Sequence, residues 1–119
     1  LLNFGHTIGH AVESLCGYKN ISHGEAVSIG MNSITKISEK LGLTSKGASE
    51  RLKNVCKKYF LPVENSFPIE ELSEAILQDK KNLGDYINLV ILKDIGSSFL
   101  LKLPSSNISD FLEGRGIYF

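Results

Sequence analysis

All three histidines of this 119-residue chain lie near its beginning. His6 and His10 are one helical turn apart, and His23 lies at the predicted start of the next helix. Imidazole is a common ligand of divalent transition metals, and side chains on neighbouring helices can converge on one ion. The spacing therefore predicts part of a divalent-metal site, in which His6 is joined by a histidine of the next helix.

The segment around His6 and His10 has the pattern of an amphipathic helix. At about 100° per residue, its apolar residues share one stripe, which consists of Phe4, Ile8, Ala11, Val12 and Leu15. The opposite stripe contains Asn3, His6, His10 and Glu13. A single histidine on a helix is usually a surface residue or a core residue with satisfied hydrogen bonds. A functional site is favoured here, because two histidines are aligned with an amide and a carboxylate and a third histidine is nearby.

Residues 22–25 have the pattern of a capping box, with Ser22 as the N-cap and Glu25 three positions later. His23 then occupies the first helical position, from which its side chain projects in a defined direction. Capping by itself explains Ser22 and Glu25, but it does not explain His23.

The elements that would carry these residues are mainly helices. We expect five of them, with these approximate bounds: Asn3 to Leu15, His23 to Leu41, Thr44 to a stop before Pro62, Pro68 to the segment Asp79-Lys80-Lys81, and Ser106 to Leu112. The apolar face of the second helix is predicted to contain Val27, Met31, Ile34 and Leu41. That of the fourth is predicted to contain Leu72, Ala75 and Ile76.

Two short β-prone segments, Tyr86–Leu92 and Ser98–Leu103, flank a turn that contains Gly96. This pattern predicts a β-hairpin, although residues 87–92 are also compatible with a buried helical segment. The predicted fold class is therefore mainly α, with one small β-hairpin.

Composition predicts one domain that spans residues 1–119. Hydrophobic residues make up 42% of the chain, which suffices for a core, and the net charge of zero gives no indication of a nucleic acid or membrane partner. No apolar stretch is long enough to span a bilayer. Cys16 and Cys56 lack metal-ligand spacing, so we expect buried, reduced thiols and a cytoplasmic protein.

The histidine-rich segments resemble the 3-dehydroquinate synthase family. The resemblance is carried by Leu2–Glu13, Gly17–Tyr18 and His23–Met31, and more weakly by Leu61-Pro62, Asp79-Lys80-Lys81 and Ile95-Gly96. It implies a phosphate lyase of the shikimate pathway, which leads to chorismate and the aromatic amino acids. The family converts 3-deoxy-D-arabino-heptulosonate 7-phosphate to 3-dehydroquinate and phosphate, with NAD and a divalent metal, zinc or cobalt.

The resemblance also implies a role for individual residues. His6 and His23 correspond to metal ligands, and His10 corresponds to a residue of the proton and substrate network beside the metal. Asn3 and a lysine of Asp79-Lys80-Lys81, either Lys80 or Lys81, correspond to groups that bind the anionic substrate.

The chain departs from the family in lacking a dinucleotide-binding domain. It has no glycine-rich phosphate loop after a strand and no alternation of strands and helices. We therefore expect a C-terminal helical metal- and substrate-binding domain that is inactive alone. By the resemblance, the N-terminal domain would supply most NAD contacts and a glutamate as the third metal ligand, and the full-length enzyme would be a homodimer.

Other functions remain compatible with the sequence. A metal-dependent alcohol or glycerol dehydrogenase also presents spaced histidines to a metal, and other sugar-phosphate cyclases share the chemistry. A non-catalytic helical interaction module is a further alternative, but such a module normally exposes apolar anchors rather than Asn, His and Glu. A gluzincin protease is excluded, because Thr7 follows His6 where that motif requires glutamate.

Overall fold

The computed structural model describes residues 4–17, 19–80 and 84–115, and the side chains of these residues other than Asp79 and Lys80. Its elements follow in the order α1 (His6–Cys16), α2 (His23–Lys40), α3 (Ala48–Lys58), α4 (Ile69–Lys80), β1 (Tyr86–Asp94), β2 (Ser97–Pro104), the 3-10 helix η1 (Ser105–Asn107) and α5 (Ile108–Leu112). The predicted fold, mainly α with one β-hairpin, is confirmed.

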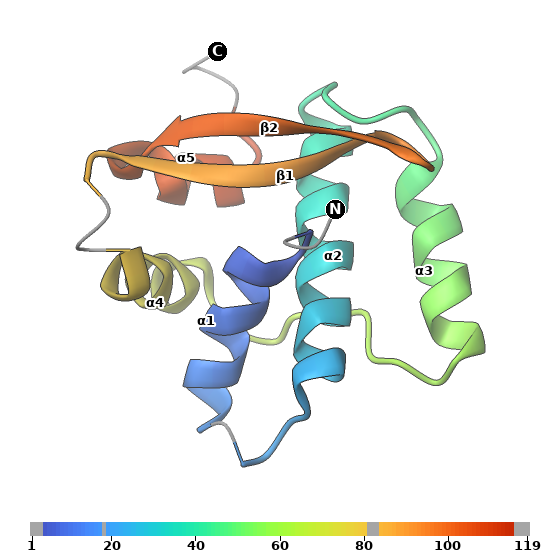
Figure 1. The fold of residues 1–119 in the computed structure, drawn as a ribbon, viewed down its shortest axis with the longest axis horizontal. Helices are drawn as coiled ribbons and strands as arrows, with labels where there is room; N and C mark the ends of the chain where they lie inside the picture. Colours follow the sequence, from blue (N-terminus) through green and yellow to red (C-terminus); the bar gives the residue numbers. More distant parts are fainter. Residues whose placement is uncertain (1–3, 18, 81–83, 116–119) are drawn as a thin grey trace.

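Helix α2 runs through the middle of the fold, with α1 against one side of it and α3 against the other (Figure 1). Helix α4 packs against the other side of α1. The antiparallel hairpin of β1 and β2 lies across one end of the helices, and α5 lies beside it (Figure 1). None of the helices in the described ranges combines the length and hydrophobicity that a bilayer crossing requires.

The hairpin covers the helices with one face. Ile87, Leu89 and Ile91 alternate along β1 and are almost fully buried, as the period of two predicts. They pair across the hairpin with residues of β2, for example Leu89 with Leu101. The same core includes residues of four helices: Ile8, Ala11 and Val12 of α1, Ala26, Ile29 and Ile34 of α2, Leu72 and Ile76 of α4, and Ile108, Phe111 and Leu112 of α5.

Helices α1 and α2 approach each other closely because glycines face each other between them. A Cβ on Gly30 of α2 would collide with the carbonyl oxygen of Gly5 and would lie 2.7 Å from the amide nitrogen of Gly9. A Cβ on Gly9 would lie 3.2 Å from the carbonyl oxygen of Ala26. Since both contacts involve backbone, the spacing of the two helices depends on the absence of these side chains.

Helix α2 is buried on more than one side, which corrects the predicted face. Of the four residues predicted for that face, only Ile34 is fully buried. Two polar residues, Ser28 and Asn32, are buried on this helix with hydrogen bonds to their side chains. The Ser28 hydroxyl donates to the carbonyl of Pro62 at 2.7 Å, and the Asn32 amide donates to the carbonyl of Ser28 at 2.8 Å.

Two predicted helix starts were wrong by three or four residues, and that of the last helix by two, because α5 begins at Ile108 after the 3-10 turn of η1. Helix α1 begins at His6 rather than Asn3, since Gly5 at its N-cap has a left-handed φ of 78°. Helix α3 begins at Ala48 rather than Thr44. The Thr44 hydroxyl donates instead to the carbonyl of Leu92 at 2.5 Å and so ties the α2–α3 connection to the hairpin.

The two cysteines are free thiols, as predicted. Cys56 is buried as expected, whereas Cys16 is only half-buried because it lies in the last turn of α1. The predicted inward face of α4 is confirmed for Leu72 and Ile76, and Ala75 packs against the core from a half-buried position.

Candidate metal centre

The three histidines meet at the junction of α1 and α2. The ring centroids of His6 and His23 are 5.3 Å apart, those of His6 and His10 are 5.6 Å apart, and those of His10 and His23 are 6.0 Å apart. His6 and His10 lie one turn apart on α1, and His23 opens α2. Two helices thus bring the three imidazole rings close together, and their role as a metal site stays a prediction.

The position of His23 is defined by the capping box of α2, which is present as predicted. The backbone amide of Glu25 donates to the Ser22 hydroxyl at 3.1 Å, and the Glu25 carboxylate accepts from the Ser22 amide at 2.9 Å. The hydrogen bond from the Ser22 backbone, followed by that from its side chain, lowers the pKa of Glu25. This reciprocal pair fixes the first turn of α2 and, with it, the point from which the imidazole of His23 projects.

The hydrogen bonds of the histidines show which ring nitrogens are engaged. Nδ1 of His6 lies 3.2 Å from the carbonyl oxygen of Phe4, and Nδ1 of His23 lies 3.0 Å from Oε1 of Glu13. In both rings Nδ1 is the engaged nitrogen, so Nε2 is available to bind an ion. Metal-binding histidines usually have this arrangement, in which one nitrogen donates to an oxygen and the other binds the ion.

The ring spacing fits a shared ion. With a Zn–N bond of about 2.1 Å and tetrahedral angles, two imidazoles on one ion have centroids about 5 Å apart. The 5.3 Å between His6 and His23 agrees with this, and His10 is only slightly farther from each. The donor set of neutral imidazoles suits zinc or cobalt.

A carboxylate belongs to the same cluster. One nitrogen of His10, one nitrogen of His23 and one carboxylate oxygen of Glu13 lie within 4.8 Å of one another. Glu13 is on the polar stripe of α1 that the sequence analysis identified, but its contact with His23 was not predicted. The only signal in the sequence was its position three residues after His10, on the same helix face.

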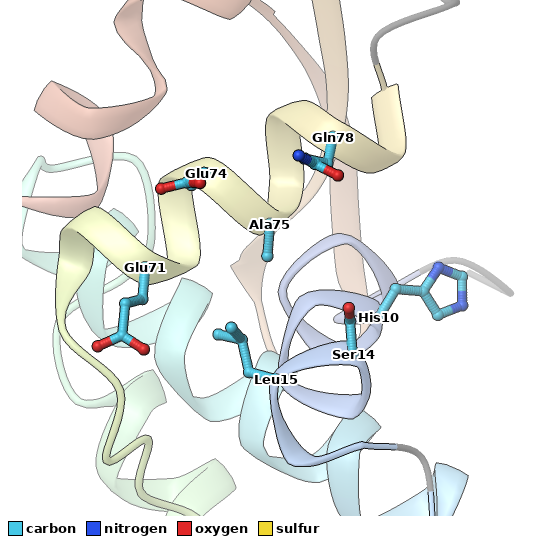
Figure 2. A pocket seen from close by; sticks show the side chains of 7 residues that line it. All are labelled: His10, Ser14, Leu15, Glu71, Glu74, Ala75 and Gln78. Carbon is cyan, nitrogen blue, oxygen red and sulfur yellow. The ribbon is translucent and has the colours of Figure 1, made fainter.

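An open cavity of about 520 Å³ borders the histidines on the side of α4. Its lining consists of His10, Ser14 and Leu15 from α1 and Glu71, Glu74, Ala75 and Gln78 from α4. Figure 2 shows His10 at the edge of this group, with its ring directed away from Glu71 and Glu74. The carboxylates of Glu71 and Glu74 make this side of the cavity unfavourable for a phosphate group.

Residues 1–82 match the family described as 3-dehydroquinate synthase C-terminal. The chain belongs to this family. The resemblance that rests on the segments around His6 and His23 is thereby confirmed.

Curated relatives agree with the family. The chain is 50% identical to the 3-dehydroquinate synthase of Clostridium acetobutylicum over 113 residues, which are 94% of this chain and 32% of that enzyme. It is 43% identical to the 3-dehydroquinate synthase of Enterococcus faecalis OG1RF over 117 residues, which are 98% of this chain and 33% of that enzyme. The chain thus spans about a third of the length of the curated relatives that it matches.

Solved structures share the fold. A 2-epi-5-epi-valiolone synthase from Streptomyces hygroscopicus subsp. jinggangensis 5008, with NAD⁺ and Zn²⁺ bound, superposes with a TM-score of 0.76 at 22% identity, over 94% of this chain and 31% of that one. A 2-deoxy-scyllo-inosose synthase complexed with carbaglucose-6-phosphate, NAD⁺ and Co²⁺ gives a TM-score of 0.72 at 22% identity, over 96% of this chain and 33% of that one.

The predicted site residues fall into two groups. The structure brings His6, His10 and His23 together. Asn3 and Lys81 lie outside the described residues, and Lys80 is described only as the last backbone position of α4. Gln78, two positions before Lys80, lines the cavity that has His10 at its edge.

Proposed function

We propose that this chain is the metal- and substrate-binding part of a 3-dehydroquinate synthase. The full enzyme would convert 3-deoxy-D-arabino-heptulosonate 7-phosphate to 3-dehydroquinate and phosphate in the shikimate pathway. The observation that carries the proposal is the convergence of His6, His10 and His23 within the segment that matches the family. The names of the curated relatives support this reaction over the other reactions of the fold.

His6 and His23 would hold a divalent ion, zinc or cobalt, through their Nε2 atoms. The ion would lower the pKa of a substrate hydroxyl that loses its proton before hydride transfer to NAD. His10 would act beside the ion in the proton and substrate network, since its ring is within contact distance of both other rings. The side chain of His10 is exposed in the described part of the chain, so a substrate can reach it.

The anionic groups of the substrate would be bound by Asn3 and by Lys80 or Lys81. An amide and an ammonium group are suitable donors to phosphate and carboxylate oxygens. Lys80 and Lys81 come two and three positions after Gln78, which lines the same cavity as His10. This proximity in the sequence to a residue of that cavity supports a role for one of the lysines near the histidines.

The remaining parts would come from an N-terminal dinucleotide-binding domain, namely most NAD contacts and a third, glutamate ligand. The complete enzyme would be a cytoplasmic homodimer that uses a small sugar-phosphate substrate and no nucleic acid or membrane. The zinc or cobalt and the NAD in the solved relatives of this fold support the cofactor assignment.

The test is phosphate release from 3-deoxy-D-arabino-heptulosonate 7-phosphate by the complete protein, with NAD and Zn²⁺ each present or omitted. We expect release only when both are present, and no turnover by residues 1–119 alone. Reduction of NAD by a simple polyol without phosphate release would instead place the protein among the metal-dependent dehydrogenases.

A second candidate is another sugar-phosphate cyclase, because solved structures with this fold include a 2-deoxy-scyllo-inosose synthase and a 2-epi-5-epi-valiolone synthase. Both share only 22% identity with the chain, whereas the synthases of Clostridium acetobutylicum and Enterococcus faecalis OG1RF share 50% and 43%. The assay separates the candidates when a hexose 6-phosphate is supplied in place of the heptulosonate phosphate. Turnover of the hexose phosphate alone would favour the second candidate.

A further inference from the structure

Glu13 and His23 form a hydrogen bond that joins α1 to α2. Glu13 Oε1 lies 3.0 Å from Nδ1 of His23, at the usual length of an N–H···O bond. The carboxylate is well shielded, with 13% of its side chain exposed, whereas 57% of the His23 side chain is exposed. Shielding of the acceptor strengthens such a bond, because water competes less for the carboxylate.

The bond determines which tautomer His23 adopts. A carboxylate can only accept, so the imidazole donates through Nδ1–H and the lone pair of the neutral ring lies on Nε2. We propose that Glu13 is a positioning residue that fixes the tautomer and the orientation of His23, so that Nε2 is presented to the metal. This inference rests on the proposed function, which supplies the metal.

His6 has an equivalent partner that does not involve Glu13. Its Nδ1 lies 3.2 Å from the backbone carbonyl of Phe4, which likewise leaves Nε2 for an ion. The two ligands are therefore set by different acceptors, one in the backbone and one in a side chain. Substitution of Glu13 removes only the acceptor of His23, so His6 serves as an internal reference for His23.

Glu13 has two other possible roles. It could link α1 to α2 with no effect on the metal, or it could be a ligand itself, since its oxygen lies within 4.8 Å of ligand atoms of His10 and His23. The 3.0 Å distance between Glu13 Oε1 and His23 Nδ1 favours the positioning role. A carboxylate that accepts a hydrogen bond from Nδ1–H leaves Nε2 of His23 as the ligand atom.

The first experiment is nitrogen-15 NMR of the histidine rings in the metal-free 119-residue chain, at a pH where the rings are neutral. In the wild-type chain we expect His23 in the Nδ1–H form. Glu13→Ala should shift His23 toward the Nε2–H form and leave His6 unchanged, and Glu13→Gln should lie between, since its amide oxygen still accepts. A tautomer of His23 that is the same in all three chains would overturn the proposal, as would an equal shift of His6 and His23.

The second experiment measures zinc affinity in the complete protein. Glu13→Ala should weaken zinc binding about 10–100-fold, Glu13→Gln less, and the exposed Glu50→Gln of α3 not at all. Thermal unfolding of each variant shows whether the fold is retained. The absorption bands of bound Co²⁺ should keep their positions in Glu13→Gln, and a change of coordination there would make Glu13 a ligand and overturn the positioning role.

The two proposals fail in different ways. If the wild-type complete protein binds no zinc, the proposed function fails and the metal role of Glu13 fails with it. If the wild-type protein binds zinc and Glu13→Ala binds it equally well, only the role of Glu13 is overturned.

Discussion

Replacement of Gly30 by alanine tests whether the close contact of α1 and α2 builds the histidine cluster. The added Cβ would collide with the carbonyl oxygen of Gly5 and lie 2.7 Å from the amide nitrogen of Gly9. Both neighbours are backbone atoms, so no side chain can rotate away. The contact can be relieved only if α1 moves away from α2, by roughly 1 Å to restore normal van der Waals distances.

The expected free-energy change follows from two opposing effects. Alanine in a helix interior is favoured over glycine by about 1 kcal/mol. Overpacking costs about 1–3 kcal/mol in ordinary cores, and the upper end applies where backbone is the obstacle. We therefore expect Gly30→Ala to lower the free energy of unfolding by about 2 kcal/mol. It should also weaken zinc binding at least about tenfold, since ligands misplaced by about 1 Å no longer share one ion well.

Two glycines of the same helix pair provide matched controls. A Cβ on Gly24 of α2 meets nothing within 4 Å, whereas one on Gly9 of α1 lies 3.2 Å from the carbonyl oxygen of Ala26. Urea unfolding followed by circular dichroism should rank stability as Gly24→Ala, then Gly9→Ala, then Gly30→Ala. Gly24→Ala should be neutral or slightly stabilising, with unchanged zinc affinity. If Gly30→Ala were as stable as Gly24→Ala and bound zinc equally well, the close contact would not position the histidines.

Three further predictions concern the site and its support. His6→Ala or His23→Ala in the complete protein should abolish metal binding and activity together, and stoichiometric zinc in either purified variant would contradict the ligand assignment. His10→Ala should lower kcat and retain the metal, whereas loss of zinc on elemental analysis would make His10 a ligand. Glu25 stabilises α2 while its carboxylate is ionised. Its pKa is lower in the folded chain than in the unfolded chain. This contribution to stability is therefore complete above the ordinary glutamate pKa of about 4.3, and it is lost as pH falls through the lowered pKa. Urea unfolding between pH 3 and 7 should show this loss in the wild-type chain and a smaller one in Glu25→Gln; equal pH dependence would contradict it.

Local chemistry was sufficient to predict the elements that have strong boundary signals. The capping box of Ser22 and Glu25 placed the start of α2 correctly, and the turn at Gly96, with a φ of 86°, placed the hairpin. Thr44 gave a misleading signal, because a threonine before a helix can either cap it or bond elsewhere. Its bond to Leu92 across the fold could not be predicted from the local sequence.

The site shows the same division between local and tertiary information. The periodicity of α1 predicted that His6, His10 and Glu13 share a face, and this needs only the helical repeat. The bond between Glu13 and His23 depends also on the distance and crossing of α1 and α2. That geometry is set by contacts around Gly30, a residue that carries no functional group.

The exposure of the histidines indicates that catalysis would require a further surface over them. Of the His23 side chain 57% is exposed, and His10 is exposed as well, so water reaches the cluster in the described part of the chain. Hydride and proton transfer are favoured where water is excluded and further charges are fixed around the substrate. The acidic cavity beside His10 cannot supply those charges for a phosphorylated substrate, since Glu71 and Glu74 line it. We therefore expect a second surface to cover the histidines in the complete protein and to add further cations to the lysine, Lys80 or Lys81, that we propose for the anionic groups.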